Sequence, residues 1–243
     1  MRADYPTPEQ TEGLRALWKE AFGDSDEFLD GYFDTAYATD RCRCITENGR
    51  IAAALYWMDC RCDGAPMAYL YAVATARLYR GQGLCRRLME DTHSHLKNLG
   101  YAGCILVPGE PELFAMYEKM GYAAFGGMDT VTVEAGSPLP LQPVTAEEYA
   151  ALRRQYLPPR GVTQEGMAFL ATYANLYAGD DFVCAWAGDT ALELLGNTAA
   201  APGILGALGK TKGRFRLPGK HPFAMYRPLS DTPAPAYFGI AFD

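Results

Sequence analysis

The sequence lacks a positive charge excess, a long apolar run and an apolar N-terminus, and each absence excludes a class of protein. Its net charge of −7 over 243 residues argues against nucleic acid as the main partner, because binding to phosphates requires a basic face. No stretch of about 18 apolar residues occurs, so we expect no membrane span. The opening residues MRADYPTPEQ are polar, so we expect no signal peptide and a cytoplasmic protein.

The cysteines do not follow the usual zinc-binding spacing. There are seven of them, and an odd number without a signal peptide predicts free thiols in a reducing cytosol. Two Cys-x-Cys pairs, at 42–44 and 60–62, could together offer four thiolates to zinc. The same spacing in a strand merely places both side chains on one face of a sheet. We favour the strand and expect no metal site.

The two commonest phosphate-binding motifs are also missing. A P-loop would end in Gly-Lys-Ser/Thr, and none is present. A dinucleotide-binding fold would carry Gly-x-Gly-x-x-Gly, but Arg86 stands where the third glycine would follow Gly81 and Gly83. Any phosphate site in this chain is therefore of another kind.

The apolar pattern of residues 1–135 predicts a mixed α/β domain. Thr7 and Ser25 are expected to cap two helices, with Pro8 in the first turn of the first one. Two strands then form a hairpin around ENGR, and MAYLYAVAT is apolar enough for the middle of a sheet. A helix over 84–98, a strand AGCILV, a helix PELFAMYEKM and two strands, YAAFGG and MDTVTVE, are expected to follow.

The remainder predicts a proline-rich linker over 136–143 and a smaller α+β accessory domain over 144–243. A capping box joins Thr145 to Glu148. A helical pattern over 163–177, the hairpin DFVCAWAGDTALELLG, a helix PGILGALG and the strands GRFRLP and HPFAMYRPL are expected after it. The apolar tail AYFGIAFD needs a place to dock, either on this second domain or near a substrate site.

The segment YRGQGLC, residues 79–85, connects the expected central strand to the helix over 84–98. A helix start exposes unpaired backbone N–H groups with a partial positive charge. Glycines let an anion approach that backbone, and Arg80 adds a charged donor. The segment is therefore either a cradle for a phosphate or pyrophosphate, or a tight turn that simply requires glycine.

Two motifs in this half resemble the acyl-CoA site of the GNAT superfamily of acetyltransferases. The family's phosphate loop, Gln/Arg-x-x-Gly-x-Gly/Ala, matches five of six places over residues 80–85, with Cys85 in the last place. The later motif Tyr-x-Lys-x-Gly-Phe/Tyr matches residues 117–122. The family often has Asn seven residues before that tyrosine, where this chain has Glu110. The resemblance covers roughly residues 5–135.

The resemblance implies a GNAT-like central mixed sheet flanked by helices, with acetyl-CoA as the acyl donor. The central strand is expected to diverge from its neighbour so that pantetheine pairs with its backbone around Val73, while the loop amides hold the pyrophosphate. The implied cofactor-binding residues are Ala72, Val73, Ala74, Thr75, Arg80, Gly81, Gln82, Gly83, Leu84 and Cys85. Arg77, Arg86 and Arg87 could add phosphate contacts, although a solvated helix face also accounts for the last two.

The resemblance further implies catalytic roles. Tyr117 is the expected general acid that protonates the departing thiolate, with packing in the core as its alternative role. The general base is expected among carboxylates, with Glu110 the chosen candidate and Asp59, Asp30 and Asp34 the others. His93 and His95 are poor candidates, because an i, i+2 pair points two ways from a helix.

These observations predict a cytoplasmic N-acetyltransferase that transfers acetyl from acetyl-CoA to a primary amine by direct attack on the thioester. Its expected partners are acetyl-CoA and an amine acceptor, with a homodimer left open. The alternative is a non-catalytic acyl-CoA-binding or regulatory protein with a degenerate site. The two-part organisation resembles the enhanced-intracellular-survival group of the family, in which C-terminal domains shape the amine pocket. A loose echo of the first half, including FAMY at 114–117 and again at 223–226, leaves a degenerate second GNAT-like unit open.

Overall fold

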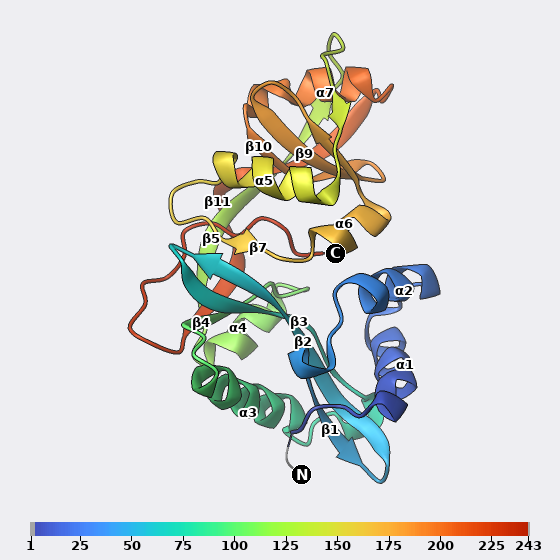
Figure 1. Ribbon diagram of the computed structural model, residues 1–243, viewed down its shortest axis with the longest axis vertical. Helices are drawn as coiled ribbons and strands as arrows, with labels where there is room; N and C mark the ends of the chain where they lie inside the picture. Colours follow the sequence, from blue (N-terminus) through green and yellow to red (C-terminus); the bar gives the residue numbers. More distant parts are fainter. Residues whose placement is uncertain (1–2, 243) are drawn as a thin grey trace. The chain divides into compact units, whose positions relative to one another are not determined.

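The computed structural model describes residues 3–242, and their contacts divide the chain into two compact units (Figure 1). Unit 1 consists of Met1–Ala123 and Met225–Pro233, and unit 2 of Ala124–Ala224 and Ala234–Asp243. The chain thus leaves unit 1, builds most of unit 2 and returns to unit 1 for a short segment. Both units combine helices with a mixed sheet, so the predicted mixed α/β class is confirmed. The domain boundaries at 135 and 144 stay a prediction.

The sheet of unit 1 contains β1 (Cys42–Glu47), β2 (Arg50–Cys62), β3 (Ala65–Thr75) and β4 (Gly103–Leu106), in that order. Met225–Pro228, the end of β11 (Lys212–Pro228), pairs antiparallel with β4 at the far edge. The predicted hairpin is confirmed, since β1 and β2 are antiparallel and Asn48 and Gly49 turn with φ of 49° and 75°. The apolar strand β3 lies between β2 and β4, as its composition predicts.

The helices of unit 1 cover both faces of this sheet (Figure 1). A 3-10 turn, Pro8–Gln10, precedes α1 (Thr11–Phe22), which packs on one face together with α2 (Asp26–Thr35). The other face is covered by α3 (Leu84–Asn98) and α4 (Glu112–Glu118). The predicted cap of α2 is present, because Ser25 Oγ accepts a hydrogen bond from the Phe28 amide at 3.2 Å.

Unit 2 places β11, β10 (Thr190–Gly196), β9 (Phe182–Ala187), β8 (Asn175–Ala178) and β6 (Gln142–Pro143) side by side, with β5 (Ala123–Glu134) paired to β11. Helix α7 (Ala201–Ala207) packs on one face through Ile204 and Leu205. On the other, Tyr149 and Arg153 of α5 (Ala146–Tyr156) meet Glu193 of β10. The Thr145–Glu148 capping box at the start of α5 is confirmed, as are the β9–β10 hairpin and α7.

The predicted pair of strands YAAFGG and MDTVTVE is wrong, because β5 runs unbroken through Gly126 and Gly127. GRFRLP and HPFAMYRPL likewise form the single strand β11. The glycines permit close approach of two backbones instead of a turn. A Cβ on Gly127 would lie 1.8 Å from the carbonyl oxygen of Gly219, and a Cβ on Gly219 would lie 2.1 Å from Cγ of Asp129.

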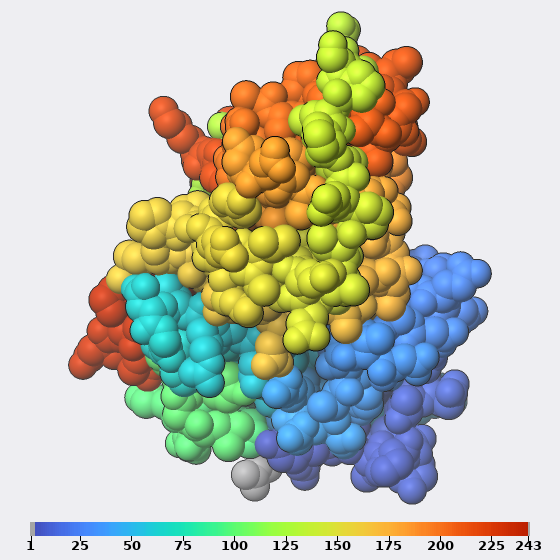
Figure 2. Space-filling model, turned by 45° about the horizontal axis from the view of Figure 1, so that its top comes forward, coloured from blue at the N-terminus to red at the C-terminus, as the bar shows by residue number. Residues whose placement is uncertain are grey.

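The helical pattern over 163–177 is also longer than the helix that forms. Only Met167–Tyr173 is helical, as α6, with β7 (Thr163–Gln164) before it and β8 after it. Residues 136–143 lie mostly exposed on the surface (Figure 2), where they form a proline-rich crossing between β5 and α5. Tertiary packing therefore shortens the helix that local periodicity favoured.

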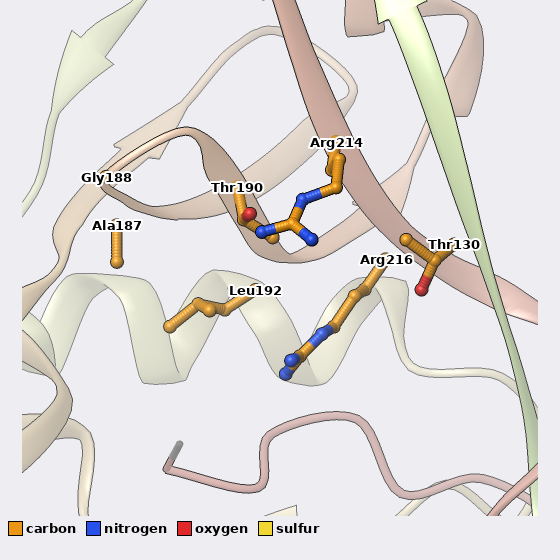
Figure 3. Close-up of a pocket in the computed structure, with 7 residues that line it drawn as sticks. All are labelled: Thr130, Ala187, Gly188, Thr190, Leu192, Arg214 and Arg216. Atoms are coloured by element: carbon orange, nitrogen blue, oxygen red, sulfur yellow. The ribbon is translucent and has the colours of Figure 1, made fainter.

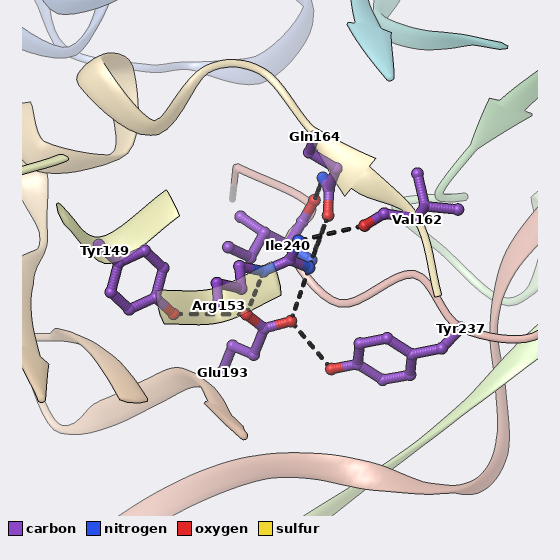
Figure 4. A network of polar contacts seen from close by, with 7 residues as sticks. All are labelled: Tyr149, Arg153, Val162, Gln164, Glu193, Tyr237 and Ile240. Carbon is purple, nitrogen blue, oxygen red and sulfur yellow. Dashed lines mark hydrogen bonds and ion pairs between the residues drawn. The ribbon is translucent and has the colours of Figure 1, made fainter. Parts of the chain in front are cut away.

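A buried ion pair organises unit 2 (Figure 4). Arg153 Nε lies 2.6 Å from Oε2 of Glu193, and both side chains are almost fully buried. Burial alone would lower the pKa of Arg153, but the Glu193 carboxylate outweighs burial and raises that pKa above its usual value. Tyr237 donates to Glu193 Oε1 at 2.9 Å, and Gln164 Nε2 donates to the carbonyl of Ile240 at 2.7 Å. The network thereby anchors the C-terminal segment.

The apolar tail docks on unit 2. Phe238, Ile240 and Phe242 are buried, and the ring of Phe242 stacks on Phe169 with centroids 5.7 Å apart. Docking on the second half, one of the two expected places, is confirmed for this part of the tail. Asp243 lies outside the described residues.

The cysteines of the two Cys-x-Cys pairs lie in β1 and β2 as buried thiols, and within the described chain none of them forms a disulfide. Over residues 3–242, no group of three or more His, Cys, Asp or Glu side chains is arranged to hold a metal ion. The same part of the chain contains no helix with the length and apolar character needed to cross a membrane.

Candidate active site

The central strand β3 separates from its neighbour β4 partway along its length. The parallel ladder pairs Met67 with Gly103, Ala68 with Cys104 and Tyr69 with Ile105, and its register goes no further. β3 itself continues to Thr75, still paired with β2 on its other side. The backbone groups of residues 70–75 on the β4 side are therefore not used by that ladder. This is the divergence that the sequence resemblance implied, and it includes Val73.

A β-bulge marks the same segment. Tyr71 pairs with Tyr56 and Ala74 with Ala54, so Ala72 and Val73 together oppose the single residue Leu55. Ala72 has a φ of 47°, in the left-handed region that a residue with a Cβ rarely adopts. Bulges bend and twist a strand and are frequent beside active sites. The bulge gives a physical reason for the divergence of β3 from β4.

The glycine-rich loop leads from β3 into α3. Gly81 and Gly83 have φ of 76° and 75°, so each requires glycine for its backbone conformation. A Cβ on either glycine would meet no atom of the described chain within 4 Å. The two glycines therefore allow the left-handed backbone conformation of the loop, and their backbone stays accessible because no side chain covers it. This arrangement combines the two expected roles, a tight turn and a surface that an anion can approach.

The start of α3 has the electrostatics of an anion site. Gly83 is its N-cap and provides no side-chain cap, and the first turn holds no acidic residue. The first-turn amides therefore keep their partial positive charge. Arg80 Nε donates to the carbonyl of Thr75 at 3.0 Å, which ties the exposed arginine to the end of β3. The Arg77 amide donates to Glu20 Oε1 at 2.6 Å, which fixes the loop to α1.

Leu84 and Cys85 follow the loop as the first residues of α3. Leu84 is buried in the core, and Cys85 packs against the same cluster half-buried. Burial raises the pKa of the Cys85 thiol, so it stays protonated and neutral at neutral pH. Arg86 and Arg87 are exposed on α3.

Tyr117 lies on α4 and is only 6% exposed. Its ring packs edge-on against Tyr122, with centroids 5.8 Å apart. Burial raises the pKa of the Tyr117 phenol, and the neighbouring Cys85 raises it further. Among residues 3–242, no group forms a hydrogen bond with its hydroxyl. Tyr117 is thus part of the core, as one expectation held, while its proton remains uncommitted, as the other requires.

The candidate bases differ in how far their carboxylates are already engaged. Asp59 accepts a 2.5 Å hydrogen bond from Tyr101 and pairs with Arg41 at 2.9 Å. Asp30 pairs with Arg15 at 2.5 Å. Glu110 is exposed, just before α4, and within the described chain its carboxylate has neither an ion pair nor a hydrogen bond. Asp34 is exposed on α2 and its carboxylate is likewise unengaged within the described chain, so Glu110 and Asp34 are freer than Asp59 and Asp30.

The two histidines of α3 are both engaged with tyrosines. His93 is buried, with Nε2 2.7 Å from the Tyr122 hydroxyl, and His95 Nε2 is 2.6 Å from the hydroxyl of Tyr5.

Sequence reasoning did not identify two features near β3. Thr75 Oγ1 is buried without a hydrogen-bond partner among the described residues. On the face covered by α1 and α2, Trp18 contacts Tyr32, Tyr56 and Tyr71, with ring centroids 4.8 to 5.4 Å apart. The apolar spacing of α1 and α2 was visible in the sequence, but the convergence of these rings depends on the strand register.

Comparison with known proteins decides the family. The sequence profile described as "Acetyltransferase (GNAT) domain" matches residues 2–125, just over half of the chain. The chain belongs to the GNAT acetyltransferase family. The matched region contains the diverging strand, the glycine-rich loop, α3 and α4, so the GNAT domain holds the whole candidate site.

Solved structures share the fold over nearly the full chain. A GCN5-related N-acetyltransferase from Kribbella flavida superposes with a TM-score of 0.70 at 16% identity, over 93% of this chain and 70% of that one. Eis1 from Mycobacterium abscessus gives 0.67 at 11% identity, over 94% and 74%. A putative acetyltransferase from Pyrococcus horikoshii gives 0.63 at 12% identity, over 99% and 94%. No match was found among curated proteins. The similarity in fold thus extends beyond the GNAT domain, as the two-part resemblance implied.

Proposed function

We propose that this GNAT protein is an N-acetyltransferase that moves an acetyl group from acetyl-CoA to a primary amine. Two neighbouring features support the proposal. The edge of β3 beside the Ala72 bulge is not paired with β4, and the glycine backbone at the start of α3 is not covered by side chains. An extended pantetheine arm has amides that can pair with the strand edge. A diphosphate carries the negative charge that a helix start favours.

The cofactor-binding residues follow from this placement. Ala72, Val73, Ala74 and Thr75 would pair with pantetheine, and the buried, unpartnered Thr75 Oγ1 would gain a polar partner beside it. The amides of the loop and of the first turn, over residues 81–85, would bind the diphosphate, with Arg80 as an additional charged donor at its edge.

The reaction requires three events at the thioester. The acceptor ammonium first loses a proton, and we assign this step to Glu110 acting through water, because its carboxylate has no partner in the described chain and it lies directly before α4, the helix that carries Tyr117. The amine nitrogen then attacks the carbonyl carbon, and the carbon–sulfur bond breaks. Tyr117 donates its proton to the departing sulfur, and its raised pKa keeps that proton in place until then at neutral pH. The second proton that the nitrogen loses as the amide forms restores the Tyr117 phenol.

The first test is calorimetric titration of the protein with acetyl-CoA, with NADH and ATP as controls. Selective binding in the micromolar range, at about −8 kcal/mol, is the expected result. Equal affinity for ATP would point to a general phosphate site, and no binding of acetyl-CoA would contradict the proposal.

The second test separates catalysis from binding. Tyr117→Phe keeps the ring in the core and removes only the hydroxyl. We expect acetyl-CoA affinity to be unchanged while turnover with an amine library falls by roughly 10²-fold or more. Full turnover in this variant would show that Tyr117 only packs in the core and is not the general acid. Acetyl-CoA binding without turnover on any amine in the wild-type protein would favour the non-catalytic alternative.

A further inference from the structure

Unit 1 has a cleft of about 400 Å³ that the proposed acetyl transfer does not use. Its walls are one side of α1, the turn between β1 and β2, and the 3-10 turn Arg77–Tyr79. None of its lining residues belongs to 72–75 or 80–85, which carry the proposed cofactor contacts. The volume lies within the range of small-molecule sites, about 300 to 1,000 Å³.

The cleft carries charged groups of both signs. Arg50, at the start of β2, lines it, and within the described residues its guanidinium forms neither an ion pair nor a hydrogen bond. Glu20 lines it from α1. Its Oε1 accepts the Arg77 amide at 2.6 Å, which leaves Oε2 without a partner in the same part of the chain. Glu9 adds a second carboxylate, whose pKa is lowered mainly by a hydrogen bond with the Thr7 side chain.

Apolar side chains form much of the remaining surface of the cleft. Leu17 and Ile51 line it and are buried in unit 1. Leu78 also lines it and is 73% exposed, the largest exposed fraction among the large apolar side chains of the described chain. An apolar part of a ligand that covers Leu78 removes this side chain from water, which is favourable.

The two signs of charge distinguish between classes of ligand. A simple carboxylate or phosphate would meet Arg50 but would be repelled by Glu9 and Glu20, and a simple amine would be repelled by Arg50. A zwitterion suits both signs. Its carboxylate matches the fork of the guanidinium, and its ammonium group can donate to a carboxylate.

We propose that this cleft binds a free α-amino acid with a large apolar side chain. Arg50 pairs with the carboxylate of the ligand and Glu20 with its ammonium group, while the apolar side chain packs against Leu17, Ile51 and Leu78. The inference does not rest on the proposed acetyl transfer, because Tyr117 and the glycine-rich loop contribute nothing to the lining.

The test is an NMR titration of the whole 243-residue chain with L-phenylalanine in the absence of acetyl-CoA. The backbone amide resonances of Gly49 and Leu78 are observed, since both residues line the cleft. This local readout separates the cleft from an amine that binds at the active site. We expect saturable shifts with a Kd of about 1 mM or tighter.

Two analogues test the charges on the unaltered protein. Phenylpropanoate lacks the ammonium group and phenylethylamine lacks the carboxylate. Each should bind at least roughly tenfold more weakly than L-phenylalanine, because one charged group of the cleft is then left unpaired. Equal affinity for either analogue would overturn the assignment of a zwitterion.

Arg50→Gln and Glu20→Gln should each raise the Kd for L-phenylalanine by roughly tenfold or more. Glutamine at residue 20 can still accept the Arg77 amide, so the turn keeps its contact with α1. One control is Glu12→Gln, which alters an exposed carboxylate of α1 outside the cleft. The other is Arg214→Gln, which removes a charge of the same sign as Arg50 from a cavity of unit 2 (Figure 3). Both should leave the Kd unchanged. Shifts that stay linear with concentration, or equal losses in the controls, would overturn the proposal.

Discussion

The Nε2 atom of His93 lies 2.7 Å from the hydroxyl oxygen of Tyr122, and both side chains are buried behind the sheet of unit 1. Burial lowers the pKa of His93 to about 3, with a smaller contribution from the charge of Arg227. The imidazole is therefore neutral in the folded protein. Burial also raises the pKa of Tyr122, so its hydroxyl remains protonated and available to that hydrogen bond.

This pair predicts sensitivity to acid. The unfolded chain protonates His93 near pH 6.5 and the folded chain only near pH 3, so stability is present above the first value and is lost as the pH falls toward the second. The change in pKa corresponds to roughly 5 kcal/mol over that interval. Urea unfolding of the wild type and of His93→Gln between neutral pH and about pH 4 measures it. We expect a shallower loss in His93→Gln than in the wild type; parallel curves would contradict the assignment.

Gly83→Val should abolish acetyl-CoA binding and Gly100→Val should not. The two glycines lie at opposite ends of α3, have φ of 75° and 87°, and have no atom of the described chain within 4 Å of a built Cβ. The backbone strain of either substitution, about 1–2 kcal/mol, is therefore matched. Only the side chain at residue 83 would occupy the diphosphate position. Calorimetry with acetyl-CoA compares them, and equal affinities would refute the loop assignment.

The left-handed Ala72 predicts an unusual response to substitution. Ala72→Gly should keep or raise stability by a few tenths of a kcal/mol, since glycine adopts a φ of 47° without penalty. Ala72→Val should destabilise by about 1–3 kcal/mol, because a branched residue resists that conformation. Thermal unfolding distinguishes the two variants. Greater stability in Ala72→Val than in Ala72→Gly would show that the bulge is not held by this residue.

Glu193→Gln should destabilise unit 2 strongly. It leaves the Arg153 charge buried without its partner 2.6 Å away, and such losses are about 3–5 kcal/mol. The exposed pair of Lys210 and Asp189, at 3.0 Å, is the comparison, and Asp189→Asn should change stability by less than about 1 kcal/mol. Hydrogen exchange should also increase over 237–242 in Glu193→Gln alone. Equal small effects in both variants would mean that the buried pair contributes little.

The turns and helix caps could be predicted from the sequence, because they depend on interactions between residues close together in the chain. The Asn48–Gly49 turn, the Ser25 cap and the Thr145–Glu148 capping box each hold their partners within a few residues, so the sequence alone indicates them. The glycine-rich loop was recognisable for the same reason. The unbroken strands β5 and β11 were not, because Gly127 and Gly219 look like turn residues until their strands are placed together.

The rest of the site depends on contacts between distant residues. Nothing local in AVAT shows that Ala72 and Val73 oppose one residue of β2. The engagement of Asp59 by Arg41 and Tyr101 likewise joins three separate elements.

The pairing of Met225–Pro228 with β4 has a consequence for biosynthesis. While the ribosome is still making residues before Met225, one edge of β4 has no partner, and unpaired strand edges invite association with other chains. Unit 1 can complete its sheet only after nearly all of unit 2 has been translated. A gene shortened to encode the GNAT region alone would therefore yield a product whose sheet lacks its last strand. Expression of the isolated GNAT region requires the codons for that C-terminal strand as well.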